Sequence, residues 1–144
     1  MSLNLAAVSK TYGGGRHGGV RAVQSLDLDV QNGEIVALLG SSGCGKTSTL
    51  RMIAGFESVT EGAITLAGRR IDPLAPARRN VAMAFEGYAL YPPLTVERNI
   101  GFGLRGPKVA ERVREIAELL QIEPILKRRP AGLSGGQQQR ASLA

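Results

Sequence analysis

The sequence is poor in the residues that mark disulfide-stabilised or membrane-spanning proteins. Cys44 is its only cysteine, so no intramolecular disulfide can form and nothing indicates an oxidising compartment. No apolar run is longer than the five residues 35–39, whereas a membrane-spanning helix needs about 20. The first four residues do not begin a signal peptide. We therefore expect an intracellular protein, with any membrane association coming through a partner.

Histidine and aromatic residues are also scarce, which disfavours two further kinds of site. His17, the only histidine, lies in the glycine tract 13–19 and has no fixed geometry or local partner there. The 18 Lys and Arg exceed the 12 Asp and Glu, which gives a net charge of +6. The basic groups at 69–70, 78–79 and 127–129 have no interleaved aromatic residues, so a solvated surface is favoured over a nucleic-acid interface. With 144 residues, we expect one domain at most.

A glycine-rich loop at residues 40–47 (GSSGCGKT) lies between two predicted elements. Residues 34–39 (EIVALL) predict a buried strand, because they form a short apolar run with β-branched residues between glycines. Residues 47–54 predict a helix with Leu50, Ile53 and Ala54 on one face, and Gly55 is placed as its C-terminal stop. Strand, loop and helix in this order are the context in which such a loop binds phosphate.

The composition of this loop suits a phosphate group. Gly40, Gly43 and Gly45 allow close approach and tolerate the left-handed angles that point successive N–H groups inward. Lys46 would place its charge on the β- and γ-phosphates, and the Thr47 hydroxyl would ligate Mg²⁺. The alternative is a turn that matches by chance in a chain with 19 glycines, and the flanking strand and helix disfavour it.

The remaining periodicities predict further strands and a helix. Leu3, Leu5 and Ala7, then Leu26, Leu28 and Val30, alternate with more polar neighbours and predict two half-buried strands joined by a loop. Three later segments are predicted from the same patterns: a short strand around 64–66, a buried strand at 81–85 (VAMAF) and an amphipathic helix from about 108 to 122, with its apolar stripe at Val109, Val113, Ile116 and Leu120.

A second motif, LSGGQ, occupies residues 133–137 just before a predicted helix that begins near Gln137. Ser134, Gly135 and Gly136 would direct backbone N–H groups, a hydroxyl and the helix dipole at a γ-phosphate. A lone SGG would be interpreted as a helix cap with two flexible glycines. Its occurrence downstream of the glycine-rich loop favours a nucleotide contact.

Together the two motifs resemble those of the ATP-binding cassette (ABC) family, and the resemblance covers nearly the whole chain. Tyr12 lies where the family's adenine-stacking aromatic would be, and the alternative is an aromatic that merely covers the loop. Residues 85–92 (FEGYALYP) resemble the family's Q-loop. Four segments are similar to the form seen in importers of sugars and polyols: 51–55, 81–83, 85–92 and 101–104.

The resemblance implies an α/β fold, namely the P-loop NTPase (RecA-like) core of an ABC ATPase. An N-terminal antiparallel β subdomain would span residues 1–33, the core up to the Q-loop 34–86, and part of the helical signature subdomain 87–144. The Walker B Asp, the adjacent catalytic Glu and the switch His would lie beyond residue 144. We therefore expect the N-terminal part of a transport ATPase that binds nucleotide better than it hydrolyses it, with some apolar surface left exposed.

The resemblance also implies the mode of action. Two such domains would sandwich two ATP molecules, with the glycine-rich loop of one facing the signature motif of the other. ATP and Mg²⁺ are the implied cofactors. The implied partners are a second nucleotide-binding subunit in a homodimer, transmembrane permease subunits and, indirectly, a solute-binding protein, with no nucleic acid. The expected location is cytoplasmic, peripheral on the inner face of the cell membrane.

The implied site residues fall into three groups. Lys46 and position 86 would be catalytic, and Thr47 and position 86 would hold the metal ion. Position 86 is Glu86 where the family has Gln, and its extra negative charge beside phosphates predicts slower turnover or weaker nucleotide binding. The implied nucleotide contacts are Tyr12, Gly40, Ser41, Ser42, Gly43, Cys44, Gly45, Lys46, Thr47, Ser48, Ser134, Gly135, Gly136 and Gln137.

Other functions remain open at this point. One is a nucleotide-binding remnant without hydrolysis, and another is an ABC protein outside transport that acts on nucleic acid or ribosomes. A P-loop kinase or GTPase is disfavoured by LSGGQ and by the lack of a guanine-recognition motif. Sugar, polyol, polyamine and inorganic anion all remain possible solutes.

Overall fold

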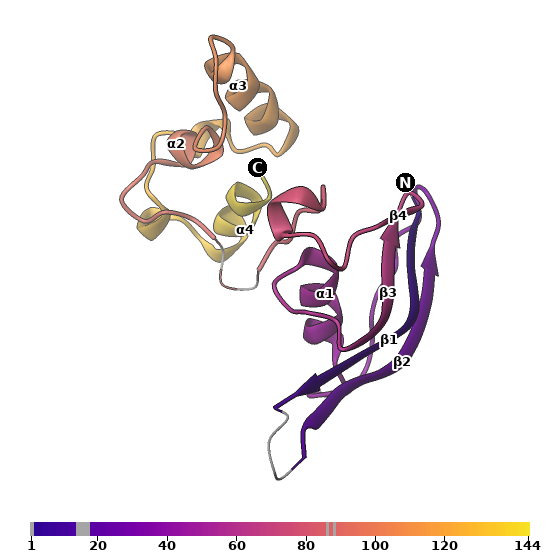
Figure 1. Cartoon of the computed structure of the whole chain (residues 1–144). Helices are drawn as coiled ribbons and strands as arrows, with labels where there is room; N and C mark the ends of the chain where they lie inside the picture. The colour runs from indigo at the N-terminus through magenta and orange to yellow at the C-terminus, as the bar shows by residue number, and fades with distance from the viewer. Residues whose placement is uncertain (1, 14–17, 86, 88) are drawn as a thin grey trace. The chain divides into compact units, whose positions relative to one another are not determined.

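The structure, a computed structural model, describes residues 2–13, 18–85, 87 and 89–144 (Figure 1). These residues form two compact units, Met1–Met83 and Ala84–Ala144. His17 and Glu86 lie outside the described residues. Among the described helices, none combines the length and the apolar character needed to cross a bilayer.

The first unit is built on a four-stranded antiparallel sheet in the order β2-β1-β3-β4. Its strands are β1 (Leu3–Tyr12), β2 (Val20–Val30), β3 (Glu61–Leu66) and β4 (Arg69–Arg70). The predictions of two N-terminal strands and of a third strand around 64–66 are confirmed. Leu3 faces both Val30 of β2 and Leu66 of β3, so β1 is the central strand of this group.

The predicted alternation of β1 is wrong at Ala7. The register of β1 against β2 shifts between Leu5 and Val8, and Ala7 has a φ of 47° with an exposed side chain. The Ala7 N–H donates to the Asp27 carboxylate at 2.7 Å. An extra residue in one strand reverses the direction of the following side chains, and Val8 is therefore fully buried in place of Ala7.

Helix α1 (Lys46–Ala54) covers one face of this sheet (Figure 1). Met52 of α1 packs against the sheet in a core of the described residues Leu5, Val8, Val23, Met52, Ile64 and Ile71. The predicted helix and its stop at Gly55, which has a φ of 89°, are confirmed. The predicted apolar face is wrong in part, because Leu50 is 47% exposed while Thr49 is buried. Thr49 tolerates burial since its hydroxyl donates to the Gly45 carbonyl at 3.0 Å.

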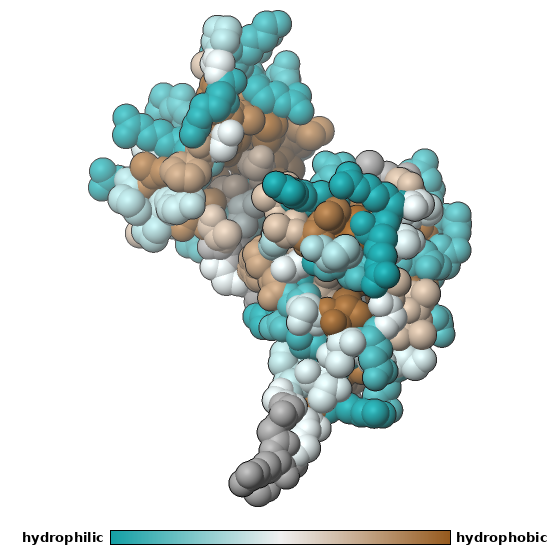
Figure 2. Space-filling model, viewed as in Figure 1, coloured by the Kyte–Doolittle hydropathy of each residue, from teal (hydrophilic) through white to brown (hydrophobic). Residues whose placement is uncertain are grey.

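Two predicted strands are absent from the described structure. Residues 34–39 and 81–85 adopt neither helix nor strand, and Ile35 and Leu39 are 97% and 90% exposed. A strand needs a neighbouring strand to take up its N–H and C=O groups, and no described strand pairs with either segment. The apolar composition of these segments was therefore not sufficient to predict either a strand or burial. Figure 2 shows apolar side chains that remain on the visible surface among hydrophilic ones.

The second unit is helical, with α2 (Val96–Ile100), α3 (Val109–Leu119) and α4 (Gly135–Leu143). The second unit also contains 3₁₀ turns at Glu123–Ile125 and Pro130–Gly132, and the first unit contains one at Pro76–Arg78. The core of the second unit consists of eight buried residues: Val96, Ile100, Val113, Ala117, Ile122, Ile125, Leu133 and Ala141. The predicted amphipathic helix is confirmed, since Val109, Ile116 and Leu120 pack against this core. Helix α4 begins at Gly135 rather than near Gln137, because Ser134 caps it.

Candidate functional site

The glycine-rich loop at residues 40–47 has the backbone angles that its sequence predicts. Gly43 and Gly45 have φ values of 83° and 94°, in the left-handed region that side chains disfavour. A Cβ atom on Gly45 would also collide with the carbonyl oxygen of Ala22 in β2. Glycine is therefore required here both for the turn and for the close approach of the loop to the sheet.

Helix α1 begins directly after this loop, and its first turn has the features of an anion site. Its N-cap residue is Gly45, which has no side chain to accept hydrogen bonds from the first N–H groups, and the first turn contains no acidic residue. Free N–H groups and the helix dipole both favour a bound anion. A cavity of about 270 Å³ lies here, lined by Ser42, Gly43, Gly45, Lys46, Thr47 and Ser48.

The Lys46 ammonium group is held inside the loop by the loop's own backbone. Its Nζ donates to the carbonyl oxygens of Gly40 at 2.8 Å and Ser41 at 2.7 Å, and lies 3.4 Å from Cys44 Sγ. No ion pair joins Lys46 to a carboxylate in the part of the chain that the structure describes. The loop thus holds a positive charge whose partners are neutral and can be exchanged for anionic oxygens.

These features fit a polyphosphate, whereas a magnesium ion would find few ligands here. Within the described residues, no group of three or more His, Cys, Asp or Glu side chains could hold a metal ion. Magnesium commonly takes only one or two protein ligands and completes its shell with phosphates and waters, and the exposed Thr47 could supply one hydroxyl. The metal and catalytic roles of Glu86 fall on a residue outside the described part and stay predictions.

Tyr12, at the end of β1, lies next to the first turn of α1. Its hydroxyl donates to Ser48 Oγ at 3.2 Å, and Ser48 also lines the cavity at the loop. The Lys10 ammonium lies over the Tyr12 ring, 4.8 Å from its centroid. The structure therefore brings the predicted base-stacking residue and the predicted phosphate loop together. Lys10 was not identified from the sequence as a neighbour of this ring, because nothing distinguishes its position in β1 from that of any other polar strand residue.

The signature residues lie in the second unit, at the start of α4. Ser134 Oγ accepts a hydrogen bond from the Gln137 N–H at 3.4 Å, and Gln137 Oε1 accepts one from the Ser134 N–H at 3.0 Å. This reciprocal pair is a capping box. Gly135 and Gly136 are exposed, so their N–H groups can be reached at the positive end of the helix. The Ser134 hydroxyl accepts in this cap and keeps its own proton to donate.

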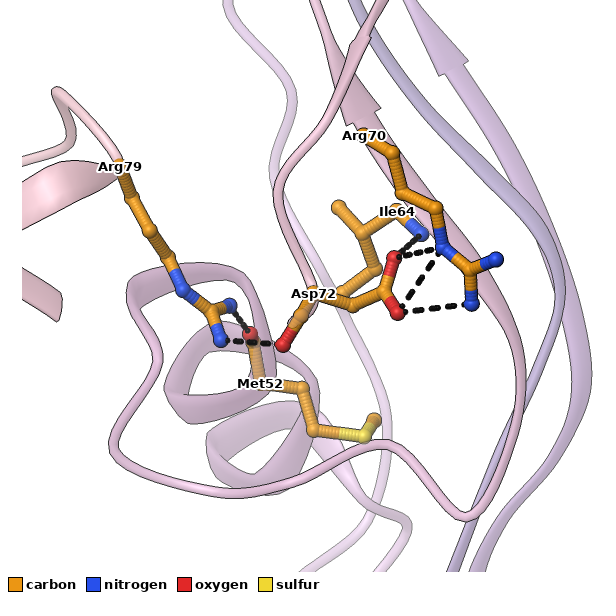
Figure 3. A network of polar contacts seen from close by, with 5 residues as sticks. All are labelled: Met52, Ile64, Arg70, Asp72 and Arg79. Atoms are coloured by element: carbon orange, nitrogen blue, oxygen red, sulfur yellow. Dashed lines mark hydrogen bonds and ion pairs between the residues drawn. The ribbon is translucent and has the colours of Figure 1, made fainter. Parts of the chain in front are cut away.

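A polar network at the other end of α1 was not predicted (Figure 3). Arg79 is only 4% exposed, so the interpretation of residues 78–79 as solvated surface is wrong for Arg79. Its guanidinium donates to the Met52 carbonyl, the Leu74 carbonyl at 2.8 Å and the Asp72 carbonyl at 2.8 Å. Burial lowers the pKa of Arg79, and the charge of Asp72 opposes this shift. The pattern of residue types could not reveal this burial, because the acceptors are backbone carbonyls.

Asp72 connects this network to the sheet. Its carboxylate accepts hydrogen bonds from Arg70 Nη2 at 2.9 Å and from the Ile64 N–H at 3.0 Å (Figure 3). Burial would raise the pKa of Asp72, but the hydrogen bonds and the charge of Arg70 outweigh it and hold this pKa below its usual value. The segment after β4 is thereby fixed both to the sheet and to the end of α1.

Comparison with known sequences places this chain in a family. Residues 23–144 match the family model described as ABC transporter. The sn-glycerol-3-phosphate import ATP-binding protein UgpC of Burkholderia mallei is 47% identical over 147 residues, which cover 99% of this chain and 40% of that protein. The spermidine/putrescine import ATP-binding protein PotA of Thermobifida fusca is 49% identical over 148 residues, covering 99% and 38%. The chain thus spans about 40% of the length of the curated relatives it matches.

Solved structures agree with the sequence comparison. A dimeric post-hydrolysis state of the ATP-binding cassette MJ0796, bound to ADP and Pi, has a TM-score of 0.83 and 28% identity and covers 98% of this chain and 67% of that chain. A second dimeric structure of MJ0796, a bacterial ABC transporter cassette, has a TM-score of 0.81 and 30% identity, covering 97% and 66%. The expected ABC ATPase fold is confirmed. On the match over residues 23–144, this chain belongs to the ABC transporter family.

Proposed function

We propose that this chain binds ATP through residues 40–48 and forms the nucleotide-binding part of an ATPase subunit of a solute importer. The observation that carries the proposal is the position of Lys46. Its ammonium is held at the uncapped start of α1, beside a cavity of about 270 Å³, by neutral carbonyl oxygens of Gly40 and Ser41. A fixed charge and free N–H groups at one helix terminus are what a triphosphate requires.

The roles of the loop residues follow from this geometry. Lys46 exchanges the Gly40 and Ser41 carbonyls for phosphate oxygens, and the N–H groups from Gly43 onward donate to the same phosphates. The Thr47 hydroxyl offers a ligand for Mg²⁺, and the Tyr12 ring supports the base. ATP supplies a phosphoanhydride bond whose hydrolysis is strongly favourable. Lys46 favours that reaction by stabilising negative charge on the phosphates, and position 86 is the second proposed catalytic and metal-binding site.

The signature residues act on a second subunit in this proposal. Gly135 and Gly136 present exposed N–H groups at the start of α4, and Ser134 retains a donor proton. These groups would contact the γ-phosphate held by the glycine-rich loop of a second copy, so that a homodimer completes each site. The dimeric structures of MJ0796 support this arrangement.

The proposal that ATP hydrolysis is coupled to transport rests on the names of the relatives. UgpC and PotA are named as import ATP-binding proteins, and we extend this role to the protein to which this chain corresponds. It would act on the cytoplasmic face of the membrane against permease subunits, with a solute-binding protein delivering the solute. We also propose the division into a β subdomain (residues 1–33), a core (34–86) and a helical signature subdomain (87–144). Because one relative is named for glycerol 3-phosphate and the other for polyamines, the solute stays open.

Calorimetric titration of ATP into the chain tests the proposal. Lys46→Ala should weaken ATP binding by about tenfold to a hundredfold, the loss expected for one charge-assisted contact of about 1.5–3 kcal/mol. Lys108→Ala, an exposed lysine of the second unit, is the matched control and should bind ATP like the wild type. Equal affinity of the wild type and Lys46→Ala would contradict the proposal.

The same samples separate the other functions. Phosphate release by the wild type above that of Lys46→Ala would support hydrolysis. ATP binding without any release would favour a nucleotide-binding role without turnover. Binding of RNA or DNA with a steep dependence on salt would favour an ABC protein outside transport.

A further inference from the structure

Lys10 is a buried cation in β1 for which the phosphate site provides no role. It is 6% exposed, and lysine is rarely buried unless its charge is compensated. Its Nζ lies 3.1 Å from the Glu57 carboxylate and donates to the Ser58 carbonyl oxygen at 2.8 Å and to Ser58 Oγ at 3.2 Å. An ammonium group has three N–H donors, and these contacts account for all of them. Lys10 therefore has no donor left for a phosphate.

The segment that holds Lys10 is itself anchored on two sides. The Glu57 N–H donates to the Arg51 carbonyl at the end of α1, and the Thr60 N–H donates to the Ser9 carbonyl in β1. The Thr11 N–H donates in turn to Thr60 Oγ1 at 3.0 Å. The ammonium is thus fixed relative to both β1 and α1.

The remaining neighbour of this ammonium is the aromatic ring of Tyr12. Lys10 Nζ lies 4.8 Å from the ring centroid, within the range of a cation–π interaction. The Tyr12 hydroxyl donates to Ser48 Oγ at 3.2 Å. The ring is therefore held at one face by Lys10 and at its edge by the first turn of α1, and Ser48 also lines the cavity beside Lys46.

We propose that Lys10 is a positioning residue for nucleotide binding: it covers one face of Tyr12 and holds the ring so that the opposite face receives the purine base. The inference rests on the proposed ATP binding and adds a residue to it. A ring that is ordered before the ligand arrives loses less conformational freedom on binding. A cation on one face also draws π-electron density from the ring, which favours stacking with an electron-rich purine on the other face.

The test compares a ligand that has a base with one that lacks it. ATP and inorganic tripolyphosphate are titrated separately into the wild type, Lys10→Met, Lys10→Arg and Tyr12→Ala. Lys10→Met should weaken ATP binding by about three- to tenfold and leave tripolyphosphate binding unchanged, because only the base is affected. Lys10→Arg keeps the cation and should restore most of the ATP affinity. In Lys10→Met/Tyr12→Ala, ATP should bind no more weakly than in Tyr12→Ala alone.

Lys127→Met is the matched control, since it removes another lysine–glutamate pair, with Glu97 at 2.6 Å, from the second unit. It should bind both probes like the wild type. If Lys10→Met unfolds the chain, Lys10→Gln replaces it, because the amide can still donate to Ser58 without a charge. Equal weakening of ATP and tripolyphosphate, or no weakening of ATP, would overturn the role of Lys10. A wild type that binds neither probe would overturn the proposed function instead.

Discussion

The guanidinium group of Arg79 donates a hydrogen bond to the backbone carbonyl oxygen of Met52, although the two residues lie 27 positions apart. Met52 belongs to the last turn of α1, where carbonyl oxygens have no partner within the helix. Arg79 supplies that partner and also donates to the Ile53 carbonyl at 3.2 Å. The helix that begins at the candidate phosphate site is therefore fixed at its other end by a buried side chain (Figure 3).

Loss of this cap should destabilise the first unit. Arg79→Met leaves several buried carbonyl oxygens without a donor, and we expect the free energy of unfolding to fall by about 2–4 kcal/mol. The neighbouring Arg78 is exposed, so Arg78→Met should change the free energy by less than about 0.5 kcal/mol. Urea unfolding followed by circular dichroism measures both variants. Similar losses in the two variants would mean that the hydrogen bonds of Arg79 contribute little.

Gly55 should tolerate substitution less well than a glycine with a similar positive φ in open space. Gly55 has a φ of 89°, and a Cβ atom there would lie against Arg79 Nε. Gly68 has a φ of 76° with nothing within 4 Å. Gly68→Ala should therefore cost about 1–2 kcal/mol for the left-handed angle alone, and Gly55→Ala about 1–3 kcal/mol more for the crowding. Thermal unfolding of the two variants gives the difference, and equal melting temperatures would contradict the contact with Arg79.

Acid should weaken the fold through Asp72. Although burial raises the pKa of Asp72, the bonds from Arg70 and the Ile64 N–H outweigh it, so the folded-state pKa lies below the unfolded-state value. A lowered pKa in the folded state stabilises the fold above the unfolded-state pKa of about 4 and loses this effect as pH falls toward the folded-state pKa. Melting temperatures of the wild type and Asp72→Asn from pH 6 to pH 2 should therefore converge in acid. Parallel curves would show that this carboxylate does not titrate as described.

Alkylation of Cys44 should block ATP binding. The thiol is exposed, and its Sγ lies 3.4 Å from Lys46 Nζ inside the proposed phosphate loop. N-ethylmaleimide would place a bulky group there, and bound ATP should slow the modification as followed by intact mass. Cys44→Ser is the control, since it should bind ATP and has no thiol that could react with the reagent. Equal rates of modification with and without ATP would place the thiol outside the nucleotide site.

The local features of this fold could be predicted from the sequence. The loop glycines, Lys46 and the stop at Gly55 follow from residue type and spacing, and the stripe of Val113 and its neighbours follows from helical periodicity. The position of the LSGGQ segment at the start of a helix was likewise predicted, and only the first residue of α4 differs, because the capping box places the N-cap at Ser134. Such features are indicated by residue type and by spacing within one or two turns of chain.

The features that could not be predicted depend on distant partners. The burial of Arg79 depends in part on carbonyl groups 26 and 27 residues away, and the position of Lys10 depends on Ser58, 48 residues away. The runs at 34–39 and 81–85 are apolar enough for strands, yet strand formation also needs a pairing neighbour. The bulge at Ala7 depends on the Asp27 carboxylate of another strand. Composition and periodicity carry no information on these pairings.

Amide hydrogen exchange of the chain with and without ATP tests the central claim most directly, because it locates the bound phosphates on the backbone. We predict that ATP slows exchange of the N–H groups of residues 43–48, at the start of α1, and that Lys46→Ala abolishes this protection. ATP binding that leaves these amides unprotected, or that protects them equally in Lys46→Ala, would contradict the assignment of the loop as the phosphate site.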